Sequence, residues 1–313
     1  MAEGVPEGVM VFAPMPQLTV MVEKPGDEPE LHLHAGGQGL WQARMISSLG
    51  VPVTFCAVLG QGEVGRVLIS LIEAEGLTLK AVRRHADSGW YVHERLGEER
   101  NVLAENPGSP LGRHDGDELY ALALSEGLKA NFCVLSGAAD PNLVPPDVYS
   151  RLGRDLHSNG TPIAADLVGD HLEAVLDANP VFIKISDEEL HADGLADKDD
   201  EETIVKAGRQ LVERGAGTVV ISRAEKPAIA LTDDSAFHVV VPELSVRDHR
   251  GAGDSMTAGV VAVLAQGGDM QQAIRTGAAA GALNVTQHGL GAGRPDAIAE
   301  LVKLVRLEPL EFP

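Results

Sequence analysis

Short runs of β-branched residues alternate with amphipathic or alanine-rich stretches along most of the chain, which limits the folds open to it. Strands are predicted at residues 8–12, 52–59, 132–137, 161–167, 180–185 and 217–223. Helices are predicted between them, at residues 38–49, 63–75, 115–126, 146–158, 169–178 and 200–214. Strands separated by helices form βαβ units, whose parallel sheet is covered on both faces. The pattern therefore predicts an α/β fold with a doubly wound, mostly parallel sheet flanked by helices.

Two regions interrupt this alternation, at residues 16–35 and 88–106. Each has two stretches of alternating residues joined by a polar turn, so we expect two β-hairpins that form a separate small sheet. In the first hairpin, His32 and His34 fall on one strand face, which is either an exposed polar face or a metal site. No internal repeat or linker divides the chain, so we expect a single domain over residues 1–313.

Charge and hydrophobicity exclude several classes of partner. Of the 313 residues 44% are hydrophobic, and the formal net charge is -21 at pH 7. A surface this acidic repels phosphate backbones and anionic lipids, and no stretch approaches the ~20 apolar residues of a membrane span. Cys56 and Cys133 lie in apolar stretches and are expected to be buried free thiols. We expect a cytoplasmic protein with no nucleic-acid and no membrane partner.

The stretch from Gly251 to Asp254 comes directly before an apolar run that predicts a helix. Small residues at Gly251, Ala252 and Gly253 let the backbone approach a ligand, and the helix start leaves N–H groups free to bind an anion. The helix dipole would keep Asp254 ionised and able to accept a proton from a hydroxyl. Capping of the helix is the alternative role for Asp254, and these residues alone leave both open.

Five stretches, taken together and in this order, resemble the ribokinase/PfkB family of sugar kinases. They are "AGGQGLWQARMISSLG" (35–50), "VLGQGEVGRVL" (58–68), "VLSGAADPNLVPPDVYSRL" (134–152), "PVFIKISDEEL" (180–190) and "RGAGDSMTAGVVAVL" (250–264). Within the family the chain looks most like the branch of 1-phosphofructokinase and tagatose-6-phosphate kinase. The resemblance runs from about residue 8 to 305 and implies a ribokinase-like domain in which the two predicted hairpins form a lid.

The resemblance also implies an activity and a set of site residues. The expected reaction is ATP-dependent phosphorylation of a hydroxyl on a small carbohydrate or sugar phosphate, with Mg²⁺ and in a homodimer formed through the lid. Asp254 matches the general base, and Gly251, Ala252 and Gly253 match the anion hole. The remaining matches are Gly36 and Gly37 in the sugar pocket, Lys184 and Ser222 on the ATP side, and Glu189, which would hold the metal through water.

Several positions depart from the pattern of this branch. Gln17 replaces an Asp that holds sugar hydroxyls, and Gln38 and Trp41 replace a Lys and an Asn of the sugar pocket. A neutral amide such as Gln38 offers hydrogen bonds but no charge to a phosphate. On the ATP side, Ser186 replaces an Asn and "SRAEKP" (222–227) replaces a glycine-containing loop. Two alternatives on the same fold therefore stay open: a catalytically weak sensor that binds a sugar or nucleotide, and a nucleoside kinase.

Overall fold

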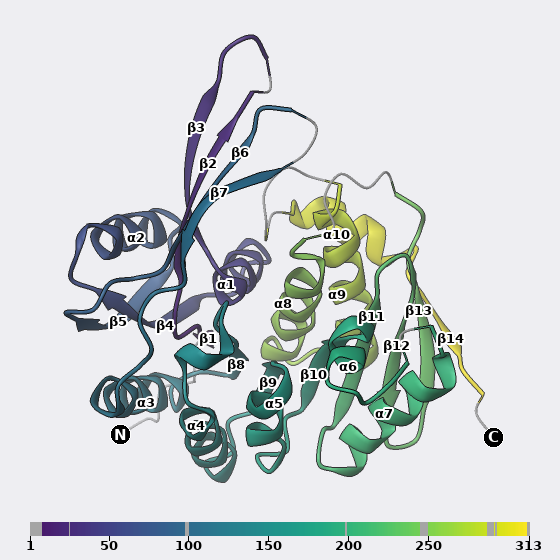
Figure 1. The fold of residues 1–313 in the computed structure, drawn as a ribbon. Coiled ribbons are helices and arrows are strands. Elements are labelled where there is room, and N and C mark those ends of the chain that lie inside the picture. The colour runs from purple at the N-terminus through teal and green to yellow at the C-terminus, as the bar shows by residue number, and fades with distance from the viewer. Residues whose placement is uncertain are drawn as a thin grey trace.

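The computed structural model describes residues 8–24, 26–97, 100–197, 199–244, 250–286, 291 and 293–311. Its larger sheet has ten strands in the order β14-β13-β12-β11-β10-β9-β8-β1-β4-β5 (Figure 1). Strands β5 to β11 in this order are parallel, and β12, β13 and β14 join antiparallel at one edge. The bounds are β1 (Val9–Phe12), β4 (Val53–Gly60), β5 (Thr78–Arg84), β8 (Phe132–Ser136), β9 (Ile163–Asp166), β10 (Phe182–Ser186), β11 (Thr218–Arg223), β12 (Lys226–Thr232), β13 (Ala236–Val240) and β14 (Arg306–Pro309).

Helices cover both faces of this sheet, and each face has its own hydrophobic cluster. One cluster holds side chains of α3 (Arg113–Gly127), α4 (Pro146–Ser158), α5 (Gly169–Leu176), α6 (Asp187–Ala192) and α7 (Glu201–Glu213). The other holds side chains of α1 (Gln38–Ser48), α2 (Glu63–Ala74), α8 (Ala252–Ala265), α9 (Met270–Asn284) and α10 (Pro295–Val302). Within β1, Met10 and Phe12 enter the first cluster and Val9 and Val11 the second, as the alternation of a strand requires. The predicted doubly wound fold is confirmed.

The predicted elements agree with the observed ones to within a few residues. For example, the helix predicted over residues 146–158 is α4, and the strand predicted over 217–223 is β11. Strands β5, β12, β13 and β14 were not predicted, and the described residues after 253 include helices α8, α9 and α10 and strand β14. Strand β5 was not predicted because the charged residues Lys80, Arg83 and Arg84 interrupt its apolar pattern. Cys56 and Cys133 are free and buried, as expected.

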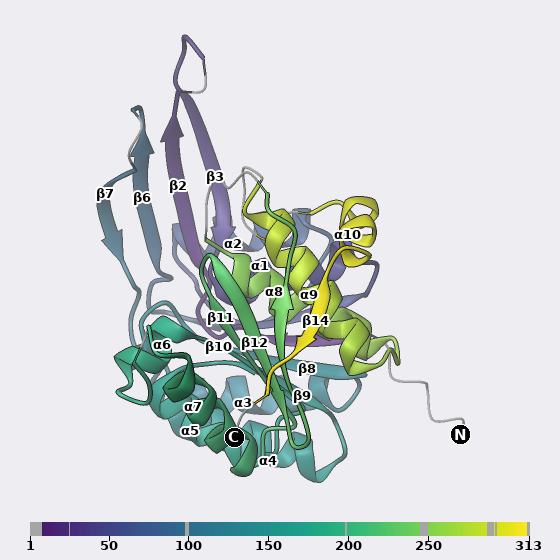
Figure 2. The same cartoon turned by 90° about the vertical axis from the view of Figure 1, so that its right-hand side faces the viewer.

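A second sheet of four strands, β3-β2-β6-β7, projects away from the larger one (Figure 2). Its strands are β2 (Gln17–Glu23), β3 (Glu30–Gly36), β6 (Trp90–Arg95) and β7 (Asn101–Asn106). These are the two hairpins predicted from the alternating residues. Leu18 and Ala35, paired at the base of this small sheet, are buried against the main core, whereas Leu31 near its tip is 65% exposed. The small sheet is therefore anchored at its base and free at its tip.

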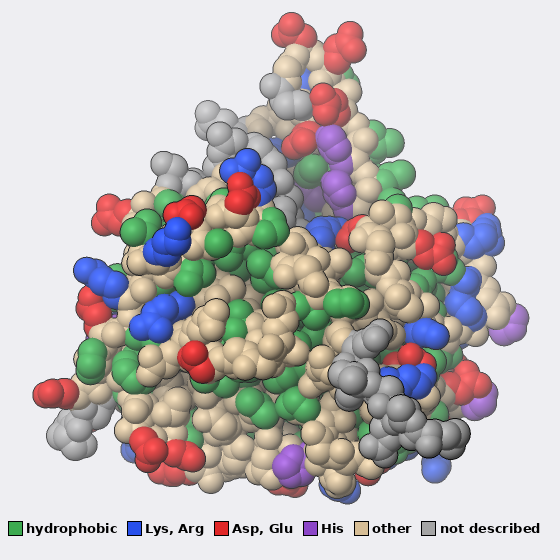
Figure 3. All heavy atoms as spheres, turned by 180° about the vertical axis from the view of Figure 1, so that it is seen from behind, with side chains coloured by type: hydrophobic (Ala, Val, Ile, Leu, Met, Phe, Trp, Pro, Cys, Tyr) green, Lys and Arg blue, Asp and Glu red, His purple; other side chains and the backbone are tan. Residues whose placement is uncertain are grey.

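Histidine and acidic side chains gather on one face of the small sheet (Figure 3). The Nε2 atom of His32 lies 3.1 Å from Glu23 Oε1 and 3.4 Å from Glu30 Oε2, and the rings of His32 and His34 are parallel with centroids 6.0 Å apart. The histidines were predicted to share this face, but the two carboxylates were not: Glu23 comes from the neighbouring strand β2, and Glu30 lies on β3 two residues before His32. This face is polar, and ligand atoms of Glu23, Glu30 and His32 lie within 4.8 Å of one another, close enough to hold one metal ion.

None of the helices within the described ranges is both long enough and apolar enough to cross a lipid bilayer.

Candidate functional site

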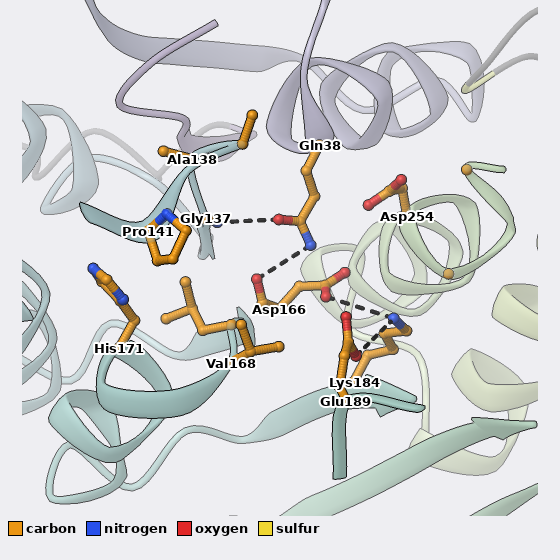
Figure 4. Close-up of a pocket in the computed structure, with 14 residues that line it drawn as sticks. Gln38, Gly137, Ala138, Pro141, Asp166, Val168, His171, Lys184, Glu189 and Asp254 are labelled. Atoms are coloured by element: carbon orange, nitrogen blue, oxygen red, sulfur yellow. Dashed lines mark hydrogen bonds and ion pairs between the residues drawn. The ribbon is translucent and has the colours of Figure 1, made fainter. Parts of the chain in front are cut away.

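The N-terminus of α8 is shaped by glycines that no other residue could replace without rearrangement. Gly251, which precedes the helix, has a φ of 71°, in the left-handed region that favours glycine. A Cβ atom on Gly253 would lie 2.6 Å from Cε and 2.7 Å from Nζ of Lys184. The absence of side chains therefore brings the ammonium of Lys184 against the first turn of the helix. Asp254 follows in the same turn and faces the cavity beside it (Figure 4).

This cavity lies at the carboxyl ends of β8, β9 and β10 and has a volume of about 380 Å³. Ligands of open α/β sheets bind at this edge because loops and helix N-termini converge there. The residues that line the cavity are Gln38, Gly137, Ala138, Ala139, Pro141, Asp166, Leu167, Val168, His171, Lys184, Glu189, Gly251, Gly253 and Asp254. Their charged groups crowd at the end nearest α8, and the other end is mostly apolar (Figure 4).

A buried ion-pair network forms the floor of the cavity. Lys184 Nζ lies 3.8 Å from Asp166 Oδ1 and 3.6 Å from Glu189 Oε2. Asp166 Oδ2 also accepts hydrogen bonds from Gln42 Nε2 and Thr257 Oγ1, each at 2.8 Å. Burial alone would lower the pKa of the Lys184 ammonium, but the charges of Asp166, Glu189 and Asp254 together raise it. Lys184 is therefore a permanent positive charge beside the α8 N-terminus.

Glu189 is held in place by the first turn of α6. Ser186 caps this helix: its Oγ accepts from the backbone N–H of Glu189 at 3.2 Å, and its own N–H donates to Glu189 Oε2 at 2.6 Å. This reciprocal pair is a capping box, in which Ser performs the role for which it is favoured at helix starts. Ser222, at the end of β11, pairs in register with Ser186. Ser186, which stands where the sugar kinases that the chain resembles have an Asn, therefore still holds the Glu189 carboxylate at the cavity through this capping box.

Gln38, the first residue of α1, connects two walls of the cavity. Its Oε1 accepts from the backbone N–H of Gly137 at 3.2 Å, and its Nε2 donates to the backbone oxygen of Asp166, also at 3.2 Å (Figure 4). Both ends of the amide are therefore engaged with backbone groups. A lysine at this position could donate to the Asp166 oxygen but could not accept from Gly137.

Burial raises the pKa of the Asp254 carboxyl to about 8, and the negative charge of Asp166 adds to this effect. The attraction of Lys184 and a hydrogen bond from Gln38 act in the opposite direction but do not balance it. The expectation that the helix dipole keeps Asp254 ionised at neutral pH is therefore wrong for the free protein. Loss of hydration outweighs a dipole that contributes about 1 kcal/mol.

The structure places the sequence-predicted site residues in two groups. Six of them line the cavity: Asp254, Gly251, Gly253, Gln38, Lys184 and Glu189. The other six are not among its lining residues: Ala252, Gly36, Gly37, Gln17, Trp41 and Ser222. In this second group, Gln17 pairs with Gly36 at the base of the small sheet, and the backbone of Trp41 packs against Gly291.

Sequence reasoning missed Asp166, Gly137 and His171, which also line the cavity. Asp166 ends β9 and Gly137 follows β8, both of which were predicted strands. These two residues could therefore have been predicted, because polar or small residues at the carboxyl ends of adjacent parallel strands meet at one edge of the sheet. His171 gave no such signal, since it belongs to the buried face of α5.

Comparisons with known proteins identify a family and a fold. The sequence model of the pfkB family carbohydrate kinases matches residues 12–297. A 1-phosphofructokinase of Borreliella burgdorferi is 28% identical over 249 residues, which are 79% of this chain and 79% of that protein. The ATP-dependent 6-phosphofructokinase isozyme 2 of Escherichia coli is 27% identical over 259 residues, 81% of this chain and 82% of that protein.

Solved structures show the same fold. The crystal structure of phosphofructokinase-2 from Escherichia coli in complex with potassium superimposes with a TM-score of 0.82 at 22% identity, over 95% of this chain and 98% of that one. The family match covers most of the chain, including the small sheet, the cavity residues and the glycine-rich start of α8. The chain belongs to the pfkB family of carbohydrate kinases.

Proposed function

We propose that this protein transfers the γ-phosphate of ATP to a hydroxyl of a small carbohydrate, with Asp254 as the general base. The observation that carries the proposal is the position of Asp254 in the first turn of α8, facing a cavity that also holds Lys184 and Glu189. Phosphoryl transfer requires alignment and charge neutralisation rather than covalent help from the protein. This arrangement supplies a proton acceptor, an anion-binding helix start and a fixed cation within one cavity.

Each group at the α8 N-terminus has a separate task in this reaction. Asp254 accepts the proton of the attacking hydroxyl as the oxygen bonds to phosphorus. The backbone N–H groups that follow Gly251, Ala252 and Gly253 donate to the equatorial oxygens of the transferring group. Lys184 lies against Gly253 and adds a positive charge on the same side. These groups are fixed before the substrates bind, so little reorganisation opposes the reaction.

The nucleotide side also has groups that fit Mg²⁺. Glu189 and Asp166 present carboxylate oxygens at the cavity, and oxygen ligands are the ones Mg²⁺ prefers. Glu189 would hold the ion through water, and Ser222 would contact the nucleotide next to Ser186. Mg²⁺, when bound, neutralises charge on the ATP phosphates.

The acceptor side lies where the small sheet joins α1. Gly36, Gly37, Gln38, Gln17 and Trp41 would surround the carbohydrate, with the small sheet of residues 16–35 and 88–106 as a lid that excludes water. Water exclusion matters because water competes with the acceptor for the phosphoryl group. A nucleoside acceptor would call for aromatic side chains to stack on its base, but Trp90 packs against the main core, which favours a structural role for this residue.

The proposal is tested by ADP release from MgATP with sugars, polyols, sugar phosphates and nucleosides offered in turn. We expect ADP release that depends on a carbohydrate. A sensor would show a thermal shift with a carbohydrate but no ADP release. Absence of both ADP release and any thermal shift with MgATP would contradict the proposal.

The pH dependence of kcat/KM should follow the raised pKa of Asp254. Below about pH 8 the carboxyl of the free enzyme is protonated and cannot accept a proton, so kcat/KM should rise about tenfold per pH unit and level off above pH 8. Initial rates from pH 6 to 9.5 measure this profile. A profile that is flat over this range would show that no group with this pKa acts as the base.

We further propose a homodimer that packs through the apolar face of the small sheet. Leu31 and Leu33 are 65% and 45% exposed, and the register places them beside Val22 and Val20 on one face. An apolar sheet face of this kind is costly in water and is covered in stable proteins. Sedimentation velocity should show a dimer for the wild type and a monomer for Leu31→Glu.

The matched control is Leu128→Glu, which places the same charge at an exposed leucine at the end of α3. It should remain dimeric. A monomeric wild type, or a dimer that Leu31→Glu leaves intact, would contradict this interface.

A further inference from the structure

The cavity is strongly asymmetric in charge along its length. Near α8 it holds the carboxylates of Asp254, Asp166 and Glu189 around the single ammonium of Lys184. The opposite end is formed by small or apolar side chains: Ala138, Ala139, Pro141, Leu167 and Val168. An acceptor with its reacting hydroxyl at Asp254 that extends along the cavity would therefore direct its remaining atoms toward a wall that holds no lysine or arginine among the described lining residues.

His171, which also lines the apolar end, does not supply a free donor at Nε2. This nitrogen lies 2.7 Å from the backbone oxygen of Val144, and a carbonyl only accepts, so the Nε2–H is used there. The ring also packs edge-on against Tyr149, with centroids 4.9 Å apart. These two contacts fix the ring in the wall of the cavity.

Among the described lining residues, Lys184 is the only lysine or arginine. Its ammonium is shared between Asp166 and Glu189, and it lies against Gly253, where the transferring phosphoryl group is proposed to sit. The nucleotide phosphates therefore use this cation. A second phosphate on the acceptor would enter a cavity lined by the carboxyl groups of Asp254, Asp166 and Glu189 and find no second lysine or arginine among these residues.

Gln38 adds no charge to the cavity. Its amide bridges Gly137 and the backbone of Asp166, so it is held in a neutral contact between two walls and adds no positive charge.

We infer that the acceptor is an uncharged sugar or polyol and that Gln38 is a specificity-determining residue that disfavours a phosphorylated acceptor. This inference rests on the proposed kinase function and narrows its substrate class. It distinguishes the chain from the phosphofructokinases that it resembles, whose names specify a phosphorylated sugar.

The test compares kcat/KM within matched pairs: fructose and fructose 6-phosphate, tagatose and tagatose 6-phosphate, ribose and ribose 5-phosphate. Wild-type enzyme should prefer an uncharged member by about tenfold or more, and Gln38→Lys should shift that ratio toward the phosphorylated member by about tenfold, since an ammonium binds phosphate as a point charge. Gln210→Lys adds the same charge on the exposed face of α7 and should leave the ratio unchanged.

A second readout does not depend on turnover. Thermal shifts of Asp254→Asn with the same six compounds should be larger for the uncharged member of a pair. A wild-type preference for phosphorylated sugars in both assays would overturn the inference and leave the kinase function standing. Absence of ADP release and of thermal shifts with all six would instead contradict the proposed function, and the inference with it.

Discussion

Replacing Asp254 by asparagine is expected to lower kcat by about 10²- to 10⁴-fold, because the attacking hydroxyl loses its proton acceptor. The amide keeps the size of the side chain, so binding of MgATP, measured by calorimetry, should change little. The folded protein should also become more stable. Burial raises the pKa of Asp254 to about 8, so the folded state pays to hold its ionised form.

The sign of this stability effect follows from proton binding. Between about pH 4 and pH 8 the carboxyl of Asp254 is protonated in the folded protein but ionised in the unfolded chain. The stability that this bound proton contributes is therefore lost as the pH rises through about 8. Asp254→Asn removes that loss and should raise the free energy of unfolding at pH 8 by an amount on the order of 5 kcal/mol, which is about 1.4 kcal/mol for each pKa unit of the shift from 3.8 to about 8. Urea unfolding at pH 5 and pH 8 measures the difference.

Asp269→Asn is the matched control, because Asp269 caps α9 at an exposed site outside the cavity. Asn and Asp cap helices about equally well, so activity and stability should both be retained. An Asp254→Asn enzyme with wild-type kcat would contradict the assigned role, and a large loss of stability would mean that Asp254 is structural.

Replacing Lys184 by methionine should have the largest effect on both activity and stability. It leaves the buried carboxylate of Asp166 without its ion partner, and breaking a buried pair in this way costs about 3–5 kcal/mol. The cost should be smaller at low pH, because burial already raises the pKa of Asp166 and protonation then relieves the unpaired charge. Turnover should fall below detection, since the proposed cation beside Gly253 is lost.

A double variant separates the two effects. Asp166→Asn with Lys184→Met removes both charges, so chemical denaturation should show most of the lost stability restored while turnover stays absent. Arg214→Met, which breaks an exposed ion pair with Glu173, should cost less than about 1 kcal/mol. If Lys184→Met were no more costly than Arg214→Met, the floor of the cavity would not be a stabilising ion-pair network.

Most of the fold could be predicted because its pattern is local. A parallel strand buried on both faces is a continuous apolar run, as in β8, and in β10 Lys184 alone interrupts the run among four buried residues. The hairpins of the small sheet were equally clear from their alternation. The edge strands β5 and β14 could not be found, since charged residues are tolerated where one side of a strand meets solvent.

Sequence alone predicted the part of the candidate site that lies in the glycine-containing turn before α8. The turn from Gly251 to Asp254 is contiguous in sequence, and the structure places it at the cavity. The network beneath it is not contiguous: Gln42 and Asp166, which share a hydrogen bond, are 124 positions apart. The proton affinity of Asp254 depends on Asp166 and Lys184 through this network, so no local argument could obtain it.

The central claim is that Asp254 and the α8 N-terminus direct the γ-phosphate of ATP to a carbohydrate hydroxyl. The most direct test is phosphorus NMR of MgATP with an accepted sugar, followed in time with wild-type enzyme and with Asp254→Asn. We predict a phosphomonoester signal that grows in equal amount with ADP in the wild type and is absent with Asp254→Asn. Inorganic phosphate as the only product, or the same phosphomonoester signal with both enzymes, would contradict the claim.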